Sequence, residues 1–358
     1  MSDQMTHKER ILAAINHQPL DRVPLDYAGE AEATAKFKKA LGVKDDLALY
    51  KALDLDKLCD VSPAYLKGRH LPGGGLVDFW GVVFKPVPYD KEGNSYQEMF
   101  FHPLERFETI DEIEANYTWP KLDWFDFSAL DAQFEKFSGY ATLGGYIAPF
   151  YYYSTLRGLE NSLIDMAGDE DMADYIIGKV CDFLYDYHKR MYEYADGRID
   201  VSFLADDFGT QTGLMISLEM FDRFFKGHYQ RFAKLIKDFS IKVMHHDDGA
   251  IMPLLPRLVD EVGIEVLDPI QWHVPGMDLE TLKDRFGQKI CFHGGVDNQF
   301  VLPMGTVEDV RKETLACLET LARDGTGLIL GPCHNVQVNT PVENLLALYQ
   351  TAKDFRLP

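Results

Sequence analysis

The chain has 358 residues and a formal net charge of −21, because its 57 acidic side chains outnumber 36 basic ones. So much negative charge disfavours binding to nucleic-acid phosphates, which needs clustered lysine and arginine, and anionic membrane surfaces should repel it. Five scattered cysteines without a CxxC pair do not make the dense disulfide framework of a small secreted protein. No apolar run approaches the roughly 18 residues of a membrane span, so we expect a cytoplasmic globular protein.

The first third of the chain mixes helices with a β-rich stretch. Thr6 and Glu9 have the spacing of a capping box, which predicts a helix that begins there and ends before Pro19. Residues 23–27 are typical of a short strand and residues 36–55 of a helix. In residues 71–102, aromatic and β-branched runs flank a turn-forming segment at residues 90–94, which predicts an inserted β-hairpin. Residues 104–127 are typical of a linker.

From residue 142 onward, strands and helices alternate. Short apolar runs predict the strands, and apolar residues at helical spacing predict the helices between them. The expected strands are residues 142–147, 201–205, 241–244, 264–267, 289–292 and 327–330. The expected helices are residues 155–194, 217–239, 253–262, 279–286 and 306–321, followed by a helix with a capping box at Thr340 and Glu343.

Polar side chains that could carry chemistry follow almost every predicted strand. Alternating strands and helices predict a parallel sheet, and a closed (β/α)8 barrel brings the carboxyl ends of all its strands to one mouth. An open sheet would gather only a few of these ends at a switch point. We therefore predict a single TIM-barrel domain over residues 1–358, with residues 71–102 as the hairpin insertion. The residues that would meet at this mouth are Glu30, Asp206, Asp207, His245, His246, Asp247, Asp248, Asp268, Gln271, His293, Asp297, Cys333, His334, Asn335 and Gln337.

The run His245-His246-Asp247-Asp248-Gly249 places four ionisable groups directly after a buried strand. Alternate side chains of an extended run share a face, so His246 and Asp248 should point the same way. A histidine and a carboxylate at this spacing form half of a metal site, to which Cys333 or His334 could add a third ligand. That set would leave the open fourth position of a catalytic zinc. The alternative is a hydrogen-bonded network in which Asp248 caps a helix.

The other candidates each have a structural alternative. Asp206 and Asp207 are either general-base carboxylates or a cap for the turn that follows their strand. Tyr151 belongs to a cluster of three tyrosines that either packs in the core or contacts a ligand. On the residues alone, Glu30 and Asp297 are structural.

Several short motifs, spread over nearly the whole chain, resemble the uroporphyrinogen decarboxylase superfamily. They are Lys8-Glu9-Arg10-Ile11, Asp21-Arg22-Val23-Pro24, His246-Asp247-Asp248-Gly249, Asp268-Pro269-Ile270-Gln271, Gly294-Gly295-Val296-Asp297 and His334-Asn335 with Pro341-Val342-Glu343-Asn344. Together these motifs are specific for the superfamily, although each is weak alone. The resemblance implies a (β/α)8 barrel, in agreement with the alternation of strands and helices.

The decarboxylase branch of this superfamily fits the sequence poorly. Its members carry an arginine-rich segment after the first strand, whose cations hold the carboxylates of the porphyrinogen. Here that position reads Asp26-Tyr27-Ala28-Gly29-Glu30-Ala31. An acidic Glu30, in a chain with a net charge of −21, would repel a polyanionic substrate.

The sequence resembles more closely the other branch, the cobamide-dependent methyltransferases. Members of that branch bind zinc through a His-x-Cys pair and a later Cys; here Asp248 stands in the place of the first Cys, and Cys333 and His334 lie near the later one. A set of His, Asp and His or Cys is harder than a thiolate-rich site, which favours an oxygen donor. We expect a methoxy compound, an aromatic ether being one form, to be demethylated by the Co(I) of a corrinoid, with the metal as Lewis acid. Asp206 or Asp207 would orient the ether oxygen or protonate it.

The predicted function is therefore that of an O-demethylating methyltransferase with zinc, a partner corrinoid protein and a small methylated substrate. We also consider a homodimer. Two alternatives stay open: a uroporphyrinogen decarboxylase that forms coproporphyrinogen III, and a barrel that binds a small ligand without chemistry. The candidate catalytic residues are Asp206, Asp207 and Glu30, the metal ligands His246, Asp248, Cys333 and His334, and the substrate-binding residues Tyr151, Gln271, Asp297 and His293.

Overall fold

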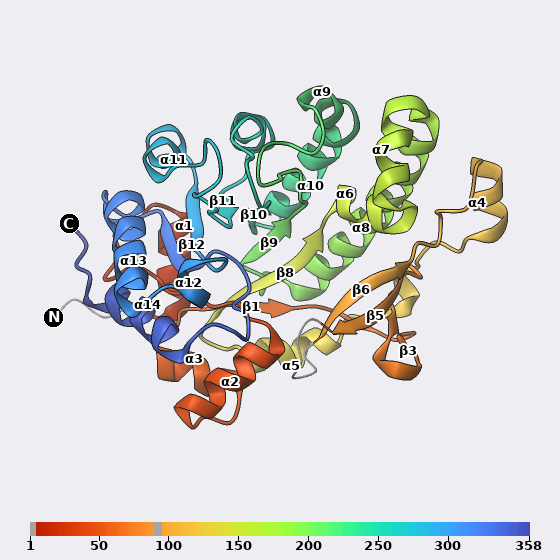
Figure 1. The fold of residues 1–358 in the computed structure, drawn as a ribbon. Helices are drawn as coiled ribbons and strands as arrows, with labels where there is room; N and C mark the ends of the chain where they lie inside the picture. Colours follow the sequence, from red (N-terminus) through yellow and green to blue (C-terminus); the bar gives the residue numbers. More distant parts are fainter. Residues whose placement is uncertain (1–4, 89–94) are drawn as a thin grey trace.

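The centre of the molecule is a seven-stranded parallel sheet. The computed structural model describes residues 5–88 and 95–358 (Figure 1). The strand order in the sheet is β1-β8-β9-β10-β11-β12-β13. The strands are β1 (Leu58–Val61), β8 (Ala141–Ile147), β9 (Val201–Leu204), β10 (Lys242–His246), β11 (Val266–Asp268), β12 (Cys291–Val296) and β13 (Leu328–Pro332). The prediction of an α/β fold with a parallel sheet is confirmed.

The two edges of this curled sheet approach one another across a short extended segment. Leu25 forms an isolated parallel bridge with Leu330 of β13. The Leu330 amide donates to the Pro24 carbonyl at 2.9 Å, and the Asp26 amide donates to the Leu330 carbonyl at 2.8 Å. On the other side, the Asp56 amide, just before β1, donates to the Leu25 carbonyl at 2.7 Å. The strand expected at residues 23–27 is thus reduced to a single bridge, and the architecture is TIM-barrel-like.

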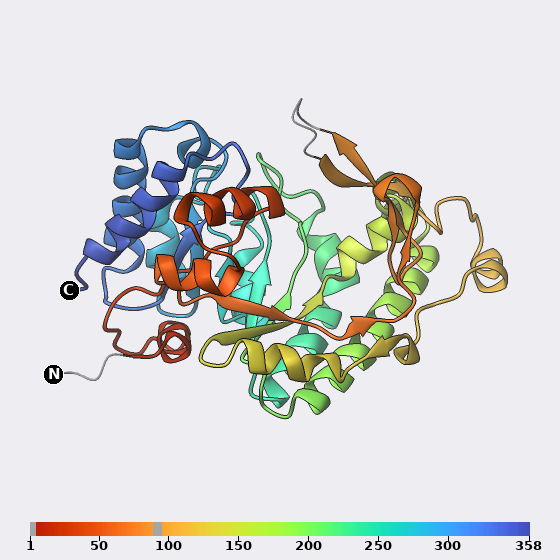
Figure 2. The same cartoon turned by 90° about the horizontal axis from the view of Figure 1, so that it is seen from below.

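Helices surround the sheet, and the first and last of them, α1 and α14, lie on one side of the molecule (Figure 2). Thr6 and Thr306 form the capping boxes of α1 and α13. The helices are α1 (His7–Ile15), α2 (Ala31–Leu41), α3 (Asp46–Leu53), α4 (Ile110–Asn116), α5 (Ala129–Lys136), α6 (Pro149–Arg157), α7 (Leu159–Gly168), α8 (Glu170–Ala195), α9 (Leu218–Met220), α10 (Lys226–Asp238), α11 (Leu279–Phe286), α12 (Val301–Met304), α13 (Val307–Leu321) and α14 (Val342–Asp354). Short 3-10 helices lie at η1 (Pro72–Gly74) and η2 (Leu122–Trp124), and π-helical turns at η3 (Phe221–Phe225) and η4 (Arg257–Val262).

Several expected element boundaries were wrong. The helix predicted for residues 36–55 is two helices, because Gly42 adopts a left-handed conformation (φ 67°) that ends α2. Gly158 (φ 82°) likewise separates α6 from α7 within the expected helix 155–194. The predicted linker 104–127 contains α4, which Thr109 caps. The capping box predicted at Thr340 is absent, since Pro341 is the N-cap of α14 and no side-chain hydrogen bond caps it.

A small antiparallel sheet occupies the region in which the hairpin was expected. Its order is β3-β4-β5-β6, from β3 (Arg69–His70), β4 (Leu76–Val77), β5 (Val83–Pro88) and β6 (Ser95–Phe101). The turn predicted at residues 90–94 lies outside the described residues. This small sheet lies on the side of the molecule opposite to α13 and α14 (Figures 1 and 2). A further pair joins β2 (Ala64–Tyr65) to β7 (Phe125–Asp126).

Two apolar cores hold the fold together. One fills the interior of the curled sheet, where Ile11 and Ala14 of α1 pack with residues such as Leu58, Val201 and Val266. These three are the first residues of their strands, so α1 covers the amino-terminal end of the sheet. The carboxyl-terminal end remains available for a functional site.

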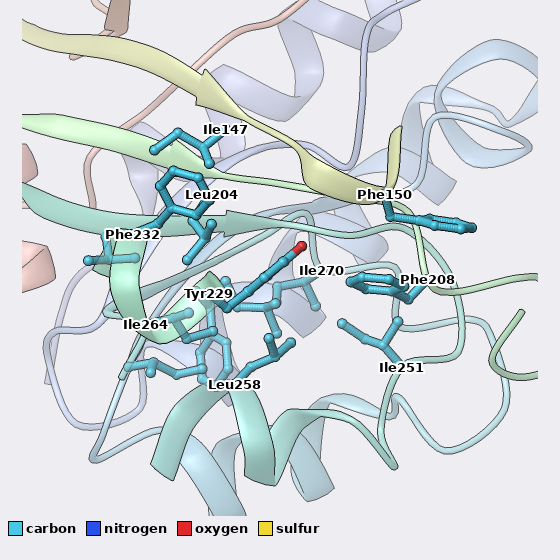
Figure 3. Packing of buried hydrophobic residues seen from close by; sticks show 14 of the residues in the cluster. Ile147, Phe150, Leu204, Phe208, Tyr229, Phe232, Ile251, Leu258, Ile264 and Ile270 are labelled. Atoms are coloured by element: carbon cyan, nitrogen blue, oxygen red, sulfur yellow. The ribbon is translucent and has the colours of Figure 1, made fainter. Parts of the chain in front are cut away.

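The larger core lies between the sheet and the helices. Figure 3 shows part of it, in which the rings of Phe150 and Phe208 stack with centroids 5.3 Å apart. Within residues 5–88 and 95–358, no helix is long and apolar enough to cross a membrane.

Candidate functional site

Three side chains at the carboxyl-terminal end of the sheet form a compact group of potential metal ligands. His246 ends β10, Asp248 follows it by two residues, and His334 comes just after β13. One ligand atom from each lies within 4.8 Å of the others. The expected sharing of a face by His246 and Asp248 therefore matches their arrangement. Between them, His245 is fully buried and its Nδ1 donates to the Leu204 carbonyl at 2.5 Å, away from the group.

Asp268 orients the His246 ring. His246 Nδ1 donates to Asp268 Oδ2 at 2.6 Å, which leaves Nε2 free to face the other two ligands. Burial alone would lower the pKa of His246, but the hydrogen bond and the charge of Asp268 outweigh it and raise the pKa to about 9. Asp268 therefore fixes the direction of the imidazole and, in the neutral ring that a metal requires, holds the remaining proton on Nδ1.

Behind Asp268, a row of alternating charges extends into the interior. His293 bridges Asp268 and Asp26: its Nδ1 donates to Asp268 Oδ1, and its Nε2 donates to Asp26 Oδ2 at 2.9 Å. Lys57 Nζ lies 3.3 Å from Asp26 Oδ1. Burial opposes charge on His293, yet the two carboxylates raise its pKa to about 9. Each buried charge thus has an opposite neighbour, which is the condition under which such charges are tolerated.

The ligand group opens into two adjoining hollows. The inner one, of about 300 Å³, is lined by residues that include His246, Asp268, His293, Lys57, Asp60 and Tyr146. The outer one, of about 450 Å³, is lined by residues that include Asp248, His334, Gln271, Cys333, Gln337 and Tyr96. Tyr96 of β6 donates to Gln337 after β13, so the antiparallel sheet reaches over this end of the molecule.

The two predicted catalytic aspartates have different surroundings. Asp206 is buried, and it accepts from the Phe150 and Tyr151 amides at 3.0 and 2.7 Å and from the Tyr229 hydroxyl at 2.6 Å. Burial raises the pKa of Asp206 well above its usual value, although these donors oppose the rise. Asp206 therefore caps α6. Asp207 is half-exposed, and its Oδ1 lies 4.0 Å from His246 Nε2.

Three more predicted residues make structural contacts. Asp297 accepts hydrogen bonds from the amides of residues 299–301 and so caps α12. Gln271 Oε1 accepts from the Gly249 amide at 2.8 Å and holds the loop that carries Asp248. Glu30 precedes α2 and accepts from Asn335 Nδ2 at 3.2 Å.

The remaining predicted residues are Tyr151 and Cys333. Tyr151 packs edge-on against Tyr146, with centroids 6.0 Å apart, and lines a shallow hollow together with Asp207. Cys333 is 5% exposed and lies outside the ligand group, which contains its neighbour His334. Burial raises the pKa of the Cys333 thiol well above its usual value.

Sequence reasoning did not assign roles to Asp26, Lys57, Asp60, Asp268 or Tyr146. Asp26 and Asp268 lie at predicted strand ends, which is a signal that could have found them. Lys57 directly precedes β1 (Leu58–Val61), and Asp60 belongs to it. This strand of four residues is too short to be recognised beside the preceding helix.

Gly209 allows the loop of Asp248 to pass close to its backbone. A Cβ at Gly209 would lie 1.9 Å from the Asp248 carbonyl oxygen, whereas one at Gly213 would meet nothing within 4 Å. We expect Gly209→Ala to lower the free energy of unfolding by about 1–3 kcal/mol, because the loop must move. Gly213→Ala should change it by less than about 0.5 kcal/mol. Urea unfolding followed by circular dichroism compares the two variants, and equal effects would contradict the close approach.

The chain is similar to known proteins in sequence and in fold. The family model described as uroporphyrinogen decarboxylase (URO-D) matches residues 127–355. A methyltransferase from Methanosarcina mazei has a similar solved structure, with a TM-score of 0.73 and 20% sequence identity over 98% of this chain and 99% of that chain. Native xylanase 10B from Thermotoga maritima gives a TM-score of 0.43 and 9% identity over 66% of this chain and 83% of that chain. The search of curated proteins found no match. The first structural likeness shows a shared fold.

Proposed function

The chain belongs to the uroporphyrinogen decarboxylase family, and we propose that it is a corrinoid-dependent methyltransferase within it. The substrate would be a small methoxylated compound, and the methyl acceptor would be the Co(I) of a corrinoid carried by a partner protein. The likeness to the Methanosarcina mazei methyltransferase supports the reaction class. The observation that carries the proposal is the convergence of His246, Asp248 and His334 at the carboxyl end of the sheet.

The ligand group fits zinc. It offers two imidazoles and one carboxylate, the kind of set that catalytic zinc sites use while keeping a position open for substrate. The second ring nitrogen of His246 donates a hydrogen bond to Asp268. Carboxylates in this position orient metal-bound histidines. A zinc ion held there would supply Lewis-acid polarisation of the ether oxygen. The absence of a thiolate from the group favours an oxygen donor over a thiol.

Asp207 is the carboxylate best placed to act on the donor. In demethylation the bond between oxygen and methyl carbon breaks, the methyl group passes to the acceptor, and the oxygen takes up a proton. Asp207 lies 4.0 Å from His246 Nε2 and is half-exposed, so it can orient the oxygen or deliver that proton. Asp206 has its oxygens engaged in capping α6, and we give it a positioning role only.

The inner hollow disfavours the decarboxylase alternative. Among the described residues that line it, Lys57 is the single lysine or arginine, and its charge, like those of His246 and His293, is already paired with Asp26 or Asp268. Asp60 and Asp268 line the same hollow. A substrate with many carboxylates would meet carboxylates there instead of the cations it needs.

We further propose that the fold is a closed (β/α)8 barrel in which residues 23–27 supply the eighth strand. The bridge from Leu25 to Leu330 and the hydrogen bond from Asp56 to Leu25 support this closure. Residues 71–102 would then be an insertion that covers part of the mouth.

One assay separates the candidate functions. The purified protein is mixed with a Co(I) corrinoid protein and a methoxylated donor, and methylation is followed by the absorbance of the corrinoid. In parallel, uroporphyrinogen III is supplied and coproporphyrinogen is measured. We expect donor-dependent methylation and no decarboxylation. Coproporphyrinogen formation without methylation would overturn the proposal. Absence of both activities would also overturn it and would favour a barrel that binds a small ligand without chemistry.

A further inference from the structure

A second cavity adjoins the inner hollow, and we call it the aromatic chamber. Its volume is about 330 Å³, at the lower end of the range of small-molecule sites. The chamber lies between the ends of β1 and β8 and the helix α8. Aromatic rings make up much of its lining: Tyr65, Phe79, Phe125, Tyr152, Tyr187 and Phe203.

The chamber has room and suitable walls for a single aromatic ring. An apolar cavity of about 150 Å³ can take up benzene, so the chamber could hold a substituted ring. Its own rings pack edge-on or tilted, as in the pair Phe79 and Phe125 with centroids 5.2 Å apart. Such arrangements present ring edges and faces that a further ring can contact favourably.

Four tyrosines of the chamber have unused hydroxyl groups. Within residues 5–88 and 95–358, the hydroxyls of Tyr65, Tyr146, Tyr152 and Tyr187 make no hydrogen bond. None of the four hydroxyls is among the buried atoms that lack a partner in the described part of the chain, so each is open to a hydrogen bond from water or from a ligand in the chamber. A ligand with an aromatic body and a few oxygen atoms would supply both the packing and the partners.

His188 in the chamber wall is already satisfied and neutral. Its Nδ1 donates to the Leu184 carbonyl at 2.6 Å, and its Nε2 accepts from the Tyr146 amide at 3.2 Å. Burial lowers the pKa of His188 to about 4, so the imidazole carries no charge at neutral pH. The wall on this side therefore favours a neutral ligand over an anionic one.

The chamber leads directly to the ligand group. Asp60, Leu143, Tyr146 and Phe203 line both the chamber and the inner hollow. The Phe203 ring lies edge-on to the His246 ring, with centroids 5.9 Å apart. A ring seated in the chamber can thus extend a substituent past Phe203 to His246.

We propose that the aromatic chamber binds the ring of a neutral phenyl methyl ether and directs its methoxy group toward His246. This inference rests on the proposed function and narrows its donor to a methoxyarene. The aryl oxygen would lose its methyl group to the corrinoid acceptor and take up a proton, so the product would be a phenol.

The test measures binding apart from turnover. The full chain is titrated calorimetrically with 2-methoxyphenol and, as an aliphatic control, with methoxycyclohexane. We expect 2-methoxyphenol to bind more tightly. Tyr152→Phe and Tyr187→Phe should each weaken its binding by about 3- to 10-fold, the effect of one lost hydrogen bond. Tyr194→Phe, whose hydroxyl donates to Asp131 on the surface, is the matched control and should leave the affinity unchanged.

A second measurement needs no variant. Nuclear Overhauser contacts between ring protons of 2-methoxyphenol and aromatic protons of the unmodified protein should appear if the ring lies in the chamber. Absence of these contacts, equal binding of methoxycyclohexane, or unchanged affinity in both tyrosine variants would overturn the inference.

These outcomes are distinct from failure of the proposed function. Binding of 2-methoxyphenol in the chamber without methyl transfer would retain the chamber and reject the methyltransferase. Methyl transfer from aliphatic ethers without binding of 2-methoxyphenol would retain the methyltransferase and reject the chamber as the site of the donor.

Discussion

His246→Ala and Asp248→Ala should each weaken zinc binding by at least about 100-fold and abolish methyl transfer. Loss of an outer-shell partner of a metal ligand typically reduces metal affinity by about 10- to 100-fold, so loss of a ligand should reduce it further. Both side chains belong to the group whose ligand atoms lie within 4.8 Å of one another. Removing either one leaves two ligands, which is fewer than catalytic zinc sites use.

The measurement has a readout besides activity. Metal content is determined by mass spectrometry after dialysis, and zinc affinity by calorimetry. His70→Ala is the matched control, because His70 is an exposed histidine of β3. The zinc affinity of Asp268→Asn should lie between that of the two ligand variants and that of His70→Ala. This variant removes the carboxylate that orients His246 but removes no ligand. Stoichiometric absence of metal from the unmodified protein, or unchanged affinity in both ligand variants, would refute the zinc site.

The parts of the fold that follow from local sequence patterns could be predicted. Strands β8 to β13 are buried apolar runs separated by helices with an apolar stripe, and both features are visible along the chain. Strand β1 (Leu58–Val61) was missed because its four residues depend on pairing with β8, far away in the sequence. The bridge formed by Leu25 also depends on distant residues, since its partners are Leu330 and Asp56.

In the candidate site, too, the features that follow from local sequence could be predicted and those that depend on distant residues could not. Alternation along an extended run placed His246 and Asp248 on one face, and the structure agrees. The same rule could not tell whether Asp206 or Asp207 faces the mouth, because that depends on how the end of β9 meets α6. It also could not find Lys57, whose role becomes evident only when Asp26 lies beside it.

A buried carboxylate just before β1 joins the segments that lie between the two edges of the curled sheet. Asp56 has a fully buried side chain. Its carboxylate accepts from Arg10 of α1, from Arg22 Nη1 at 2.6 Å and from the Leu25 amide at 2.9 Å. Arg10 is itself 2% exposed and keeps Asp21 on its Nε and Nη2, but replacing Asp56 removes the charge that faces Arg10 Nη1 and Arg22. Asp56 thus connects the two motifs near the amino terminus that contain Arg10 and Arg22.

We therefore expect Asp56→Asn to lower the free energy of unfolding by about 3–5 kcal/mol, the usual effect of breaking a buried ion pair on one side. Asp54→Asn is the matched control: Asp54 also pairs with Arg22, at 3.3 Å, but its side chain is 50% exposed. Asparagine tolerates the left-handed conformation at that position, and an exposed pair contributes less than about 1 kcal/mol. Urea unfolding at neutral pH measures both variants. Equal losses would mean that the buried ion pairs of Asp56 contribute no more to stability than the exposed pair of Asp54.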